Sequence, residues 1–327
     1  MASPNLSEIT TTTIRNRSKR LADNVTDNTA LFFRMKQRDK IRTVSGGETI
    51  LQELEYAENS TYKRYSGYEV LNINPSDVLT SAEFQWKQAA VAVSISGLEM
   101  LKNSGKERLI DLLEARIANA EKTMVNNISA DIYSDGTADG GKQIGGLQSL
   151  VSTSPTTGTV GGINRANFAF WRNQVNTGTL ASIDADVLGD MREAWVKQVR
   201  NRDKPDLIVG DNVTYVAFWG ALQANQRFNN TNSADAGFVT VKFMDADVCL
   251  DGGIYNGNLG SGAAAGTAYF LNCDYLHYRP HSARNMVPLS PNRRYATNQD
   301  AEVQILAWAG NLTTSGRQFQ GRYDANG

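Results

Sequence analysis

Apolar side chains recur at three- and four-residue steps through residues 104–134, and this spacing predicts one long amphipathic helix. Ser104 and Glu107 have the spacing of a capping box at its start, and Gly136 follows Asp135 where a left-handed residue would end it. About thirty residues make a rod of roughly 45 Å, much longer than the usual three or four turns. We expect its apolar stripe to be buried within the folded chain, and the stripe comprises Leu109, Leu112, Leu113, Ile117, Ala120, Met124, Ile128 and Ile132.

The sequence before this helix predicts mostly extended structure. Residues 1–30 are polar and free of aromatic side chains, which predicts an arm that gains its order from neighbours, and residues 30–42 predict a short anchored helix. Two tyrosine-rich runs, 49–58 and 62–74, flank a polar turn at 59–61 and predict a β-ribbon. Because an isolated two-stranded ribbon is marginal in water, we expect its tyrosines to lie against something else; these are Tyr56, Tyr62, Tyr65 and Tyr68.

Beyond the long helix the pattern predicts a mixed α/β region. Residues 152–164 have loop composition and mark a boundary, after which 181–200 predict a helix, Leu207–Val209 a buried strand, and Asp211 the start of another helix. The period then changes to two, which indicates strands. The strand candidates are 84–95 before the long helix, and 238–243, 248–250, 268–271 and 303–308 after it. The fold class is therefore α+β with an irregular topology.

The length and charge of the chain indicate its number of structural units and its possible partners. A chain of 327 residues favours two structural units that share chain segments, and its formal charge of −1 recommends neither nucleic acid nor membrane nor an acidic substrate as partner. Residues 1–42, however, hold nine basic side chains against four acidic ones. These basic residues could neutralise phosphates, although a solvated or subunit-contacting charge run is the preferred interpretation. The candidates in the arm are Arg15, Arg17, Lys19 and Arg20.

Motifs for chemistry are weak. His277 and His281 have a helical spacing for a metal, but Pro280 between them favours strand and then loop, where that geometry fails. Residues 260–265 match a dinucleotide fingerprint loosely, yet a strand follows where a helix should begin. Asp135 and Asp139 lack the further ligands of a calcium loop. We predict no catalytic residues, no cofactor and no metal, and therefore no enzyme.

The two cysteines and the hydropathy of the chain indicate the cellular compartment. Cys249 and Cys273 lack metal-ligand spacing and predict two reduced thiols in a cytosolic protein. The N-terminal segment has no apolar core of a secretion signal, and no stretch reaches the roughly eighteen apolar residues of a membrane span. We therefore expect neither secretion nor a membrane partner.

The order of these segments resembles the major capsid proteins of tailed bacteriophages, which have the Hong Kong phage capsid fold. The resemblance covers nearly the whole chain: an arm (1–45), a strand-rich extended loop (46–80), a spine helix (104–134), and then a mixed α/β domain. Asp135-Gly136-Thr137 and Gly145-Gly146-Leu147 stand where many members show a similar Asp-Gly-Thr and Gly-Leu.

The resemblance implies a wedge-shaped subunit. Its peripheral domain would span 81–153 with the spine helix, completed by parts of 265–310, and its axial domain would be mainly 154–327. Subunits would form hexamers and pentamers that tile an icosahedral shell around double-stranded DNA, assembled in the bacterial cytoplasm and found in the virion. The loop tyrosines would contact the next subunit, and the basic arm would face DNA or a subunit.

The resemblance also bears on partners and on alternatives. The arm is too short to resemble the built-in scaffold of some members, so a separate scaffold protein is expected, together with a portal and a decoration or cement protein. The cross-link of some members cannot be carried over, and a permuted connectivity stays open. A tail-tube or sheath subunit is the main alternative, followed by a cytosolic α/β enzyme that uses residues 260–266 and by a nucleic-acid-binding module that uses the arm.

Overall fold

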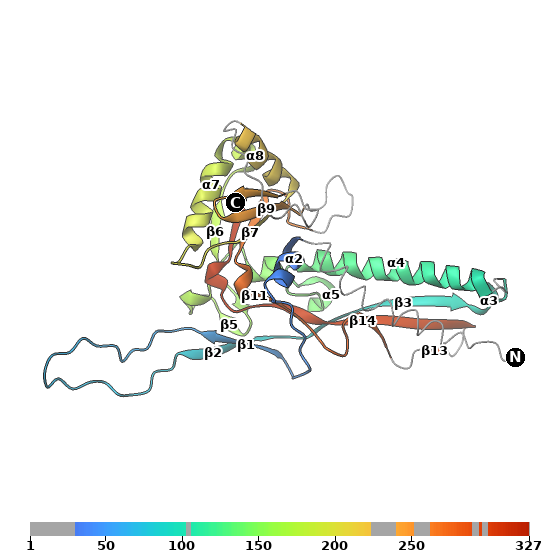
Figure 1. Ribbon diagram of the computed structural model, residues 1–327, viewed down its shortest axis with the longest axis horizontal. Coiled ribbons are helices and arrows are strands. Elements are labelled where there is room, and N and C mark those ends of the chain that lie inside the picture. The colour runs from blue at the N-terminus through green and yellow to red at the C-terminus, as the bar shows by residue number, and fades with distance from the viewer. Residues whose placement is uncertain are drawn as a thin grey trace.

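The structure is a computed structural model, elongated along the line of one long helix (Figure 1). A mixed α/β part rises above one end of this helix, long strands run beneath it, and a narrow loop projects beyond the body at that same end. The residues described are 30–102, 106–223, 240–251, 262–289, 294–295 and 300–326.

The predicted long helix is present as α4, Lys106–Ile132, with 27 residues. The second half of its apolar stripe is buried as predicted: Ile117, Ala120, Met124, Ile128 and Ile132 are each at most 6% exposed. These side chains face strand β3 (Lys87–Ser96) and the core around it. Ser104 and the side chains of Glu107, Leu109, Leu112 and Leu113 lie outside the part that the structure describes.

The exit from α4 differs from the prediction. The helix ends at Ile132, and Gly136 lies beyond it in a turn where the Asp135 carboxylate accepts a hydrogen bond from the Thr137 backbone N–H at 3.0 Å. Gly136 does have a positive φ of 80°, so the expected left-handed residue belongs to this turn and not to the helix terminus. The backbone of Gly146 lies so close to the C-terminal end of α4 that a Cβ there would overlap the carbonyl oxygens of the last helical turn.

One long strand, β14 (Ala301–Thr314), organises the sheet under α4. It pairs antiparallel with β3 over ten residues, from Ala301 opposite Ser96 to Gly310 opposite Lys87. Three shorter strands also pair with β14, namely β11 (Leu276–Pro280), β12 (Val287–Pro288) and β13 (Arg294–Tyr295). The strand predicted at 303–308 is therefore the middle of a much longer element.

The mixed α/β part is built on a six-stranded sheet. Its helices are α7 (Ile183–Gln198) and α8 (Asn212–Gln223). Asp211 caps α8 as predicted, because its carboxylate accepts from the backbone N–H groups of Val213 and Thr214 at 3.0 Å each. In order, the strands are β6 (Gln174–Thr177), β15 (Gly321–Asp324), β10 (Thr267–Leu271), β7 (Leu207–Gly210), β9 (Ala246–Leu250) and β8 (Thr240–Phe243).

Short elements connect these parts. The helices are α2 (Ala30–Gln37), α3 (Gly97–Lys102), α5 (Ala138–Gly141) and α6 (Leu147–Leu150), with 3₁₀ turns at Ala169–Trp171, Leu180–Ser182, Cys273–Tyr275 and Arg317–Phe319. A small hairpin joins β4 (Thr159–Val160) to β5 (Ile163–Asn164). The core has two buried clusters, one around α2, α4 and β14 and the other between α7, α8 and the six-stranded sheet.

The predicted ribbon pairs differently from expectation. Strand β1 (Ile50–Glu55) pairs antiparallel with β2 (Leu79–Phe84), and residues 62–74 form no strand. The reason is burial: β1 and β2 each present apolar side chains to the body, with Leu54 and Phe84 among them, whereas residues 62–74 are exposed throughout. The second strand was thus predicted in the wrong place.

We predict that Gly146→Ala destabilises the protein by on the order of 2–4 kcal/mol, because its Cβ has no room beside the end of α4. Urea unfolding measures the change. Gly189→Ala is the matched control, since Gly189 lies exposed in α7 with no atom near its Cβ position, and alanine there should be neutral or stabilise by about 0.5–1 kcal/mol. Equal effects of the two substitutions would contradict this account.

Candidate functional site

The extended loop presents apolar side chains to solvent at its far end. Residues 56–78 run between β1 and β2 and project beyond the rest of the molecule (Figure 1). Tyr62, Tyr65 and Tyr68 are 78%, 64% and 107% exposed, and Val70 and Ile73 are 87% and 91% exposed. We call residues 62–73 the loop tip. So much exposed apolar surface on a segment without a core is typical of a surface that another molecule covers.

A few polar contacts hold the two arms of the loop together. The Ser60 hydroxyl donates to the Ser76 hydroxyl oxygen at 3.1 Å, and the Lys63 ammonium pairs with the Glu69 carboxylate at 2.9 Å. Gly67, with a φ of 60°, turns the chain between these arms. The loop therefore has a defined hairpin-like course without a regular strand ladder.

Tyr56 lies apart from the other three predicted tyrosines. It is half-buried at the base of the loop, where its ring centroid is 5.7 Å from that of Phe170 in the same chain. The structure therefore groups Tyr62, Tyr65 and Tyr68 at the tip and places Tyr56 against the body of the same chain.

Two hollows flank Tyr56 and Phe170 at the base of the loop. The smaller, of about 290 Å³, is lined by apolar residues that include Leu79 and Phe168, which are 73% and 46% exposed. The larger, of about 640 Å³, is lined by carboxylates of β1 and of the residues after it and by several aromatic rings, and we call it the base groove. Its charged and aromatic residues are Glu53, Glu55, Tyr56, Glu58, Phe170, Trp171, Arg200, Tyr275 and Phe319.

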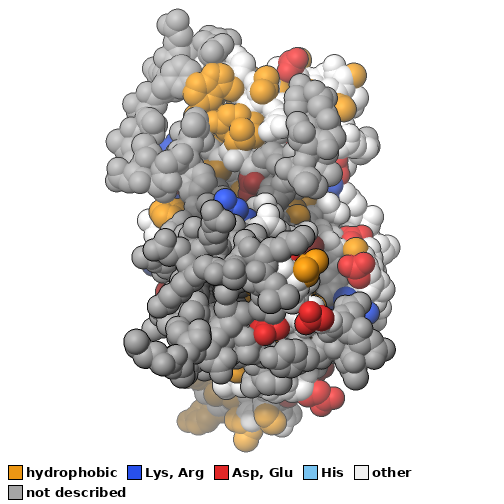
Figure 2. All heavy atoms as spheres, turned by 90° about the vertical axis from the view of Figure 1, so that its right-hand side faces the viewer, with side chains coloured by type: hydrophobic (Ala, Val, Ile, Leu, Met, Phe, Trp, Pro, Cys, Tyr) orange, Lys and Arg blue, Asp and Glu red, His pale blue; other side chains and the backbone are white. Residues whose placement is uncertain are grey.

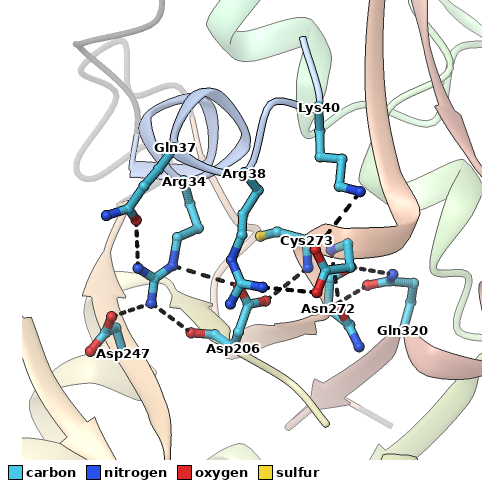
Figure 3. Close-up of polar contacts among 10 residues, drawn as sticks. Arg34, Gln37, Arg38, Lys40, Asp206, Asp247, Asn272, Cys273 and Gln320 are labelled. Atoms are coloured by element: carbon cyan, nitrogen blue, oxygen red, sulfur yellow. Dashed lines mark hydrogen bonds and ion pairs between the residues drawn. The ribbon is translucent and has the colours of Figure 1, made fainter. Parts of the chain in front are cut away.

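The last basic residues of the N-terminal basic run form ion pairs with acidic residues of the same chain. Helix α2 buries Leu31, Phe32 and Met35 completely, so it is anchored as predicted. Its two arginines reach the acidic residues of the six-stranded sheet and of the turn after β10, as Figure 3 shows. Arg34 pairs with Asp206 and Asp247, Arg38 pairs with Asp206 at 3.3 Å and Asp274 at 2.8 Å, and Lys40 lies 3.8 Å from Asp274. Arg15, Arg17, Lys19 and Arg20 lie outside the described residues.

Other exposed apolar side chains lie at the α/β end. Figure 2, a view along the molecule from the far end of α4, shows hydrophobic side chains gathered at the top, the end that carries α7 and α8. Val196 on α7 and Val216 on α8 are 63% and 69% exposed. This end therefore offers a second surface suited to contact with another molecule.

The candidate metal-ligating and cofactor-binding residues do not form a common site among the described residues. Within the described ranges no three His, Cys, Asp or Glu side chains are grouped to hold a metal ion. His277 lies on β11, where burial and nearby cations lower its pKa to about 4, and His281 packs against Trp86. Asp135 is engaged with Thr137, and Gly260 of the loose dinucleotide match lies outside the described residues.

The two cysteines form no disulfide. Cys249 and Cys273 are free and buried, and burial raises the pKa of the Cys249 thiol to about 12, which keeps it protonated. Of the helices that the structure describes, none combines the length and the apolar character of a membrane span.

Two buried polar residues that sequence reasoning missed join distant segments. Arg317 is fully buried and donates to the carbonyl oxygens of Leu150 and Trp171 at 2.7 and 3.1 Å and to the Asn173 side chain at 3.1 Å. Burial lowers its pKa to about 9. The Tyr133 hydroxyl, just past α4, donates to the Asp251 carboxylate at 2.5 Å. Neither residue stands in a sequence pattern that distinguishes it from a surface residue.

We predict that Asp251→Asn stabilises the protein at neutral pH. Burial raises the pKa of Asp251 from 3.8 to about 6, so the native state favours the protonated carboxyl and loses stability as the pH rises through this range. Asparagine keeps an acceptor for Tyr133 without the charge. The gain over wild type should grow as the pH rises from 4 through 6, then level off at on the order of 2–3 kcal/mol, measured by urea unfolding at each pH.

Asp245→Asn is the control of opposite sign. Lys204 lowers the pKa of the exposed Asp245 carboxyl, so its removal should cost a little stability at neutral pH. A gain for Asp251→Asn that does not change with pH would contradict the buried-carboxyl explanation.

Solved structures share this architecture. The capsid of cyanophage A-1(L) superposes with a TM-score of 0.59 at 15% sequence identity, covering 87% of this chain and 90% of that one. For the capsid of an empty GTA particle the TM-score is 0.54 at 11% identity, with 89% of each chain covered. The procapsid of satellite phage P4, which includes a size determination protein, gives 0.51 at 10% identity, covering 100% and 93%.

The protein has a phage capsid fold. The α+β fold class and the Hong Kong phage capsid fold predicted from the order of segments are thereby confirmed. No protein-family model matches the sequence, and no curated protein matches it either.

Proposed function

We propose that this protein is the structural subunit of an icosahedral tailed-phage capsid, assembling into hexamers and pentamers that enclose double-stranded DNA. The observation that carries the proposal is the capsid fold combined with a projecting loop whose apolar tip stays exposed, with no packing partner in the part of the chain that the structure describes. A shell subunit is held by many repeated interfaces, and the exposed tyrosines are suited to such interfaces. The role is mechanical and not catalytic.

The domain division is part of this proposal. Residues 1–45 form the arm, 46–80 the extended loop and 81–153 the peripheral domain with the spine helix; the axial domain is mainly 154–327. Pairing of β14 with β3 supports a contribution from 265–310 to the peripheral domain. The exposed apolar side chains on α7 and α8 support an axial end that meets other subunits at the centre of a capsomer.

The expected partners follow from the same role. They are further copies of the chain, a separate scaffold protein, a portal, a decoration or cement protein, and packaged DNA bound without sequence preference. Assembly takes place in the bacterial cytoplasm and the product is the virion. A tail-tube or sheath subunit would also use arms and loops, but the spine helix followed by Gly145-Gly146-Leu147 favours the shell.

Electron microscopy of the purified protein, with and without candidate scaffold, tests this function. Closed shells or ring-shaped capsomers support the proposal. Tubes would favour the tail subunit, and a chain that stays monomeric and binds a nicotinamide cofactor would exclude both.

We predict that Tyr62→Ala with Tyr65→Ala leaves the monomer folded and strongly reduces assembly. Both side chains are exposed in the subunit, so their loss removes little from the monomer, whereas burial in an interface would stabilise assembly by about 1–3 kcal/mol for each ring. Sedimentation and electron microscopy measure assembly, and circular dichroism measures folding. Tyr62→Phe with Tyr65→Phe keeps the rings and should assemble; wild-type assembly by the alanine variant would count against the interface.

We also predict that deleting residues 1–20 weakens salt-sensitive DNA association if the arm contacts phosphates. A variant with Arg15, Arg17, Lys19 and Arg20 all changed to Gln separates charge from arm length. If phosphate contact matters, both variants should show a shallower dependence of DNA affinity on salt concentration, measured by filter binding. Unchanged binding in both would indicate that these charges are solvated or contact a subunit.

A further inference from the structure

The two ends of the extended loop have complementary surfaces. At the tip, Lys63 is paired with Glu69, which leaves Arg64 exposed and without an ion pair among the described residues. Arg64 is flanked by the exposed ring of Tyr65, and Tyr68 lies at the turn beyond it. The tip therefore presents the unpaired charge of Arg64 among exposed aromatic and aliphatic side chains.

The base groove has the opposite charge and an aromatic wall. Glu53, Glu55 and Glu58 are all exposed and make no ion pair within the described ranges. The one cation that lines the groove, Arg200, donates to the Gln318 side chain at 2.9 Å. Tyr275 and Phe319 also line the groove and are stacked with their ring centroids 4.3 Å apart. An acidic rim beside stacked rings suits a ligand that carries one cation and several aromatic groups.

A subunit cannot fill its own groove with its own tip. The Ser60–Ser76 and Lys63–Glu69 contacts keep the two arms side by side, so the tip is held away from the base, as the projecting loop in Figure 1 shows. The occupant must therefore come from another molecule, and the complementary charge is present on every copy of this chain.

We propose that the loop tip of one copy docks in the base groove of a second copy. Arg64 pairs with the glutamates on the rim, and the Tyr65 and Tyr68 rings lie against the aromatic wall. This inference rests on the proposed shell function and names the acceptor surface for its loop. The tip and the groove are different patches, so the contact is head-to-tail, and such contacts close into rings when the rotation per subunit allows it.

Charge reversal tests the pairing. Arg64→Glu alone, or Glu53→Lys with Glu55→Lys alone, should reduce assembly at least tenfold in sedimentation and electron microscopy, while circular dichroism shows an unchanged fold. All three reversals in one chain should restore assembly, because the reversed tip then meets a reversed groove. Lys122→Glu, an exposed reversal on α4, is the matched control. Single reversals without effect, or a combined variant that stays impaired, would overturn the proposal.

Cysteine cross-linking tests the contact whether or not shells form. Chains with Arg64→Cys are mixed with chains carrying Glu55→Cys and oxidised, and each chain alone and the wild type serve as controls; the two native thiols are buried. The mixture should give a cross-linked dimer that no single variant gives. Absence of that dimer would overturn tip-to-groove docking even if shells assemble, whereas cross-linked dimers without shells or rings would overturn the shell function alone.

Discussion

Pairing between β14 and β3 is the interaction on which the arrangement of this protein depends. It joins a segment near the C-terminus to the strand that leads into the spine helix, with ten residues in continuous antiparallel register. Val93 and Ile95 of this sheet are buried in the same cluster as the apolar side chains of the second half of α4, so the helix packs on the sheet. Because β15 follows β14 after a single 3₁₀ turn and joins the six-stranded sheet, the same chain segment also fixes the α/β part relative to the spine.

Ion pairs and buried hydrogen bonds fix the orientation of the α/β part relative to the spine helix and its sheet. Arg34 and Arg38 hold α2 against the acidic ends of the six-stranded sheet, and Arg317 ties the last 3₁₀ turn to residues that follow the spine. Burial of charged groups is costly, so such contacts contribute less to stability than to a unique geometry. Apolar packing alone would allow the parts to slide, whereas a guanidinium with four fixed acceptors does not. In the proposed shell, where one shape repeats many times, that unique geometry would be required.

Local periodicity predicted the elements that bury a regular face, and it could not predict long-range pairing. The stripe of α4, the buried strand at Leu207–Val209 and the Asp211 cap follow from spacing alone. Strands β6 and β15 were missed because they are short and largely polar, and they exist only through the neighbours they pair with. A second capping box, formed by Ser96 and Glu99 at the start of α3, was visible in the sequence and was overlooked. Arg317 and Asp251 could not have been found, because their burial is set by segments distant in the chain.

The wrongly placed second strand of the ribbon has a physical reason in the exposure of residues 62–74. Residues 62–74 have the tyrosines and β-branched residues of a strand, yet no strand among the described residues pairs with them, and their apolar side chains are exposed. A sequence retains such side chains at an exposed position when another molecule covers them. Under the proposed shell function, the strand-like composition of this segment reports an interface and not the fold of the isolated chain. The free energy gained by burying the tyrosines is then available only when a second copy of the chain is present.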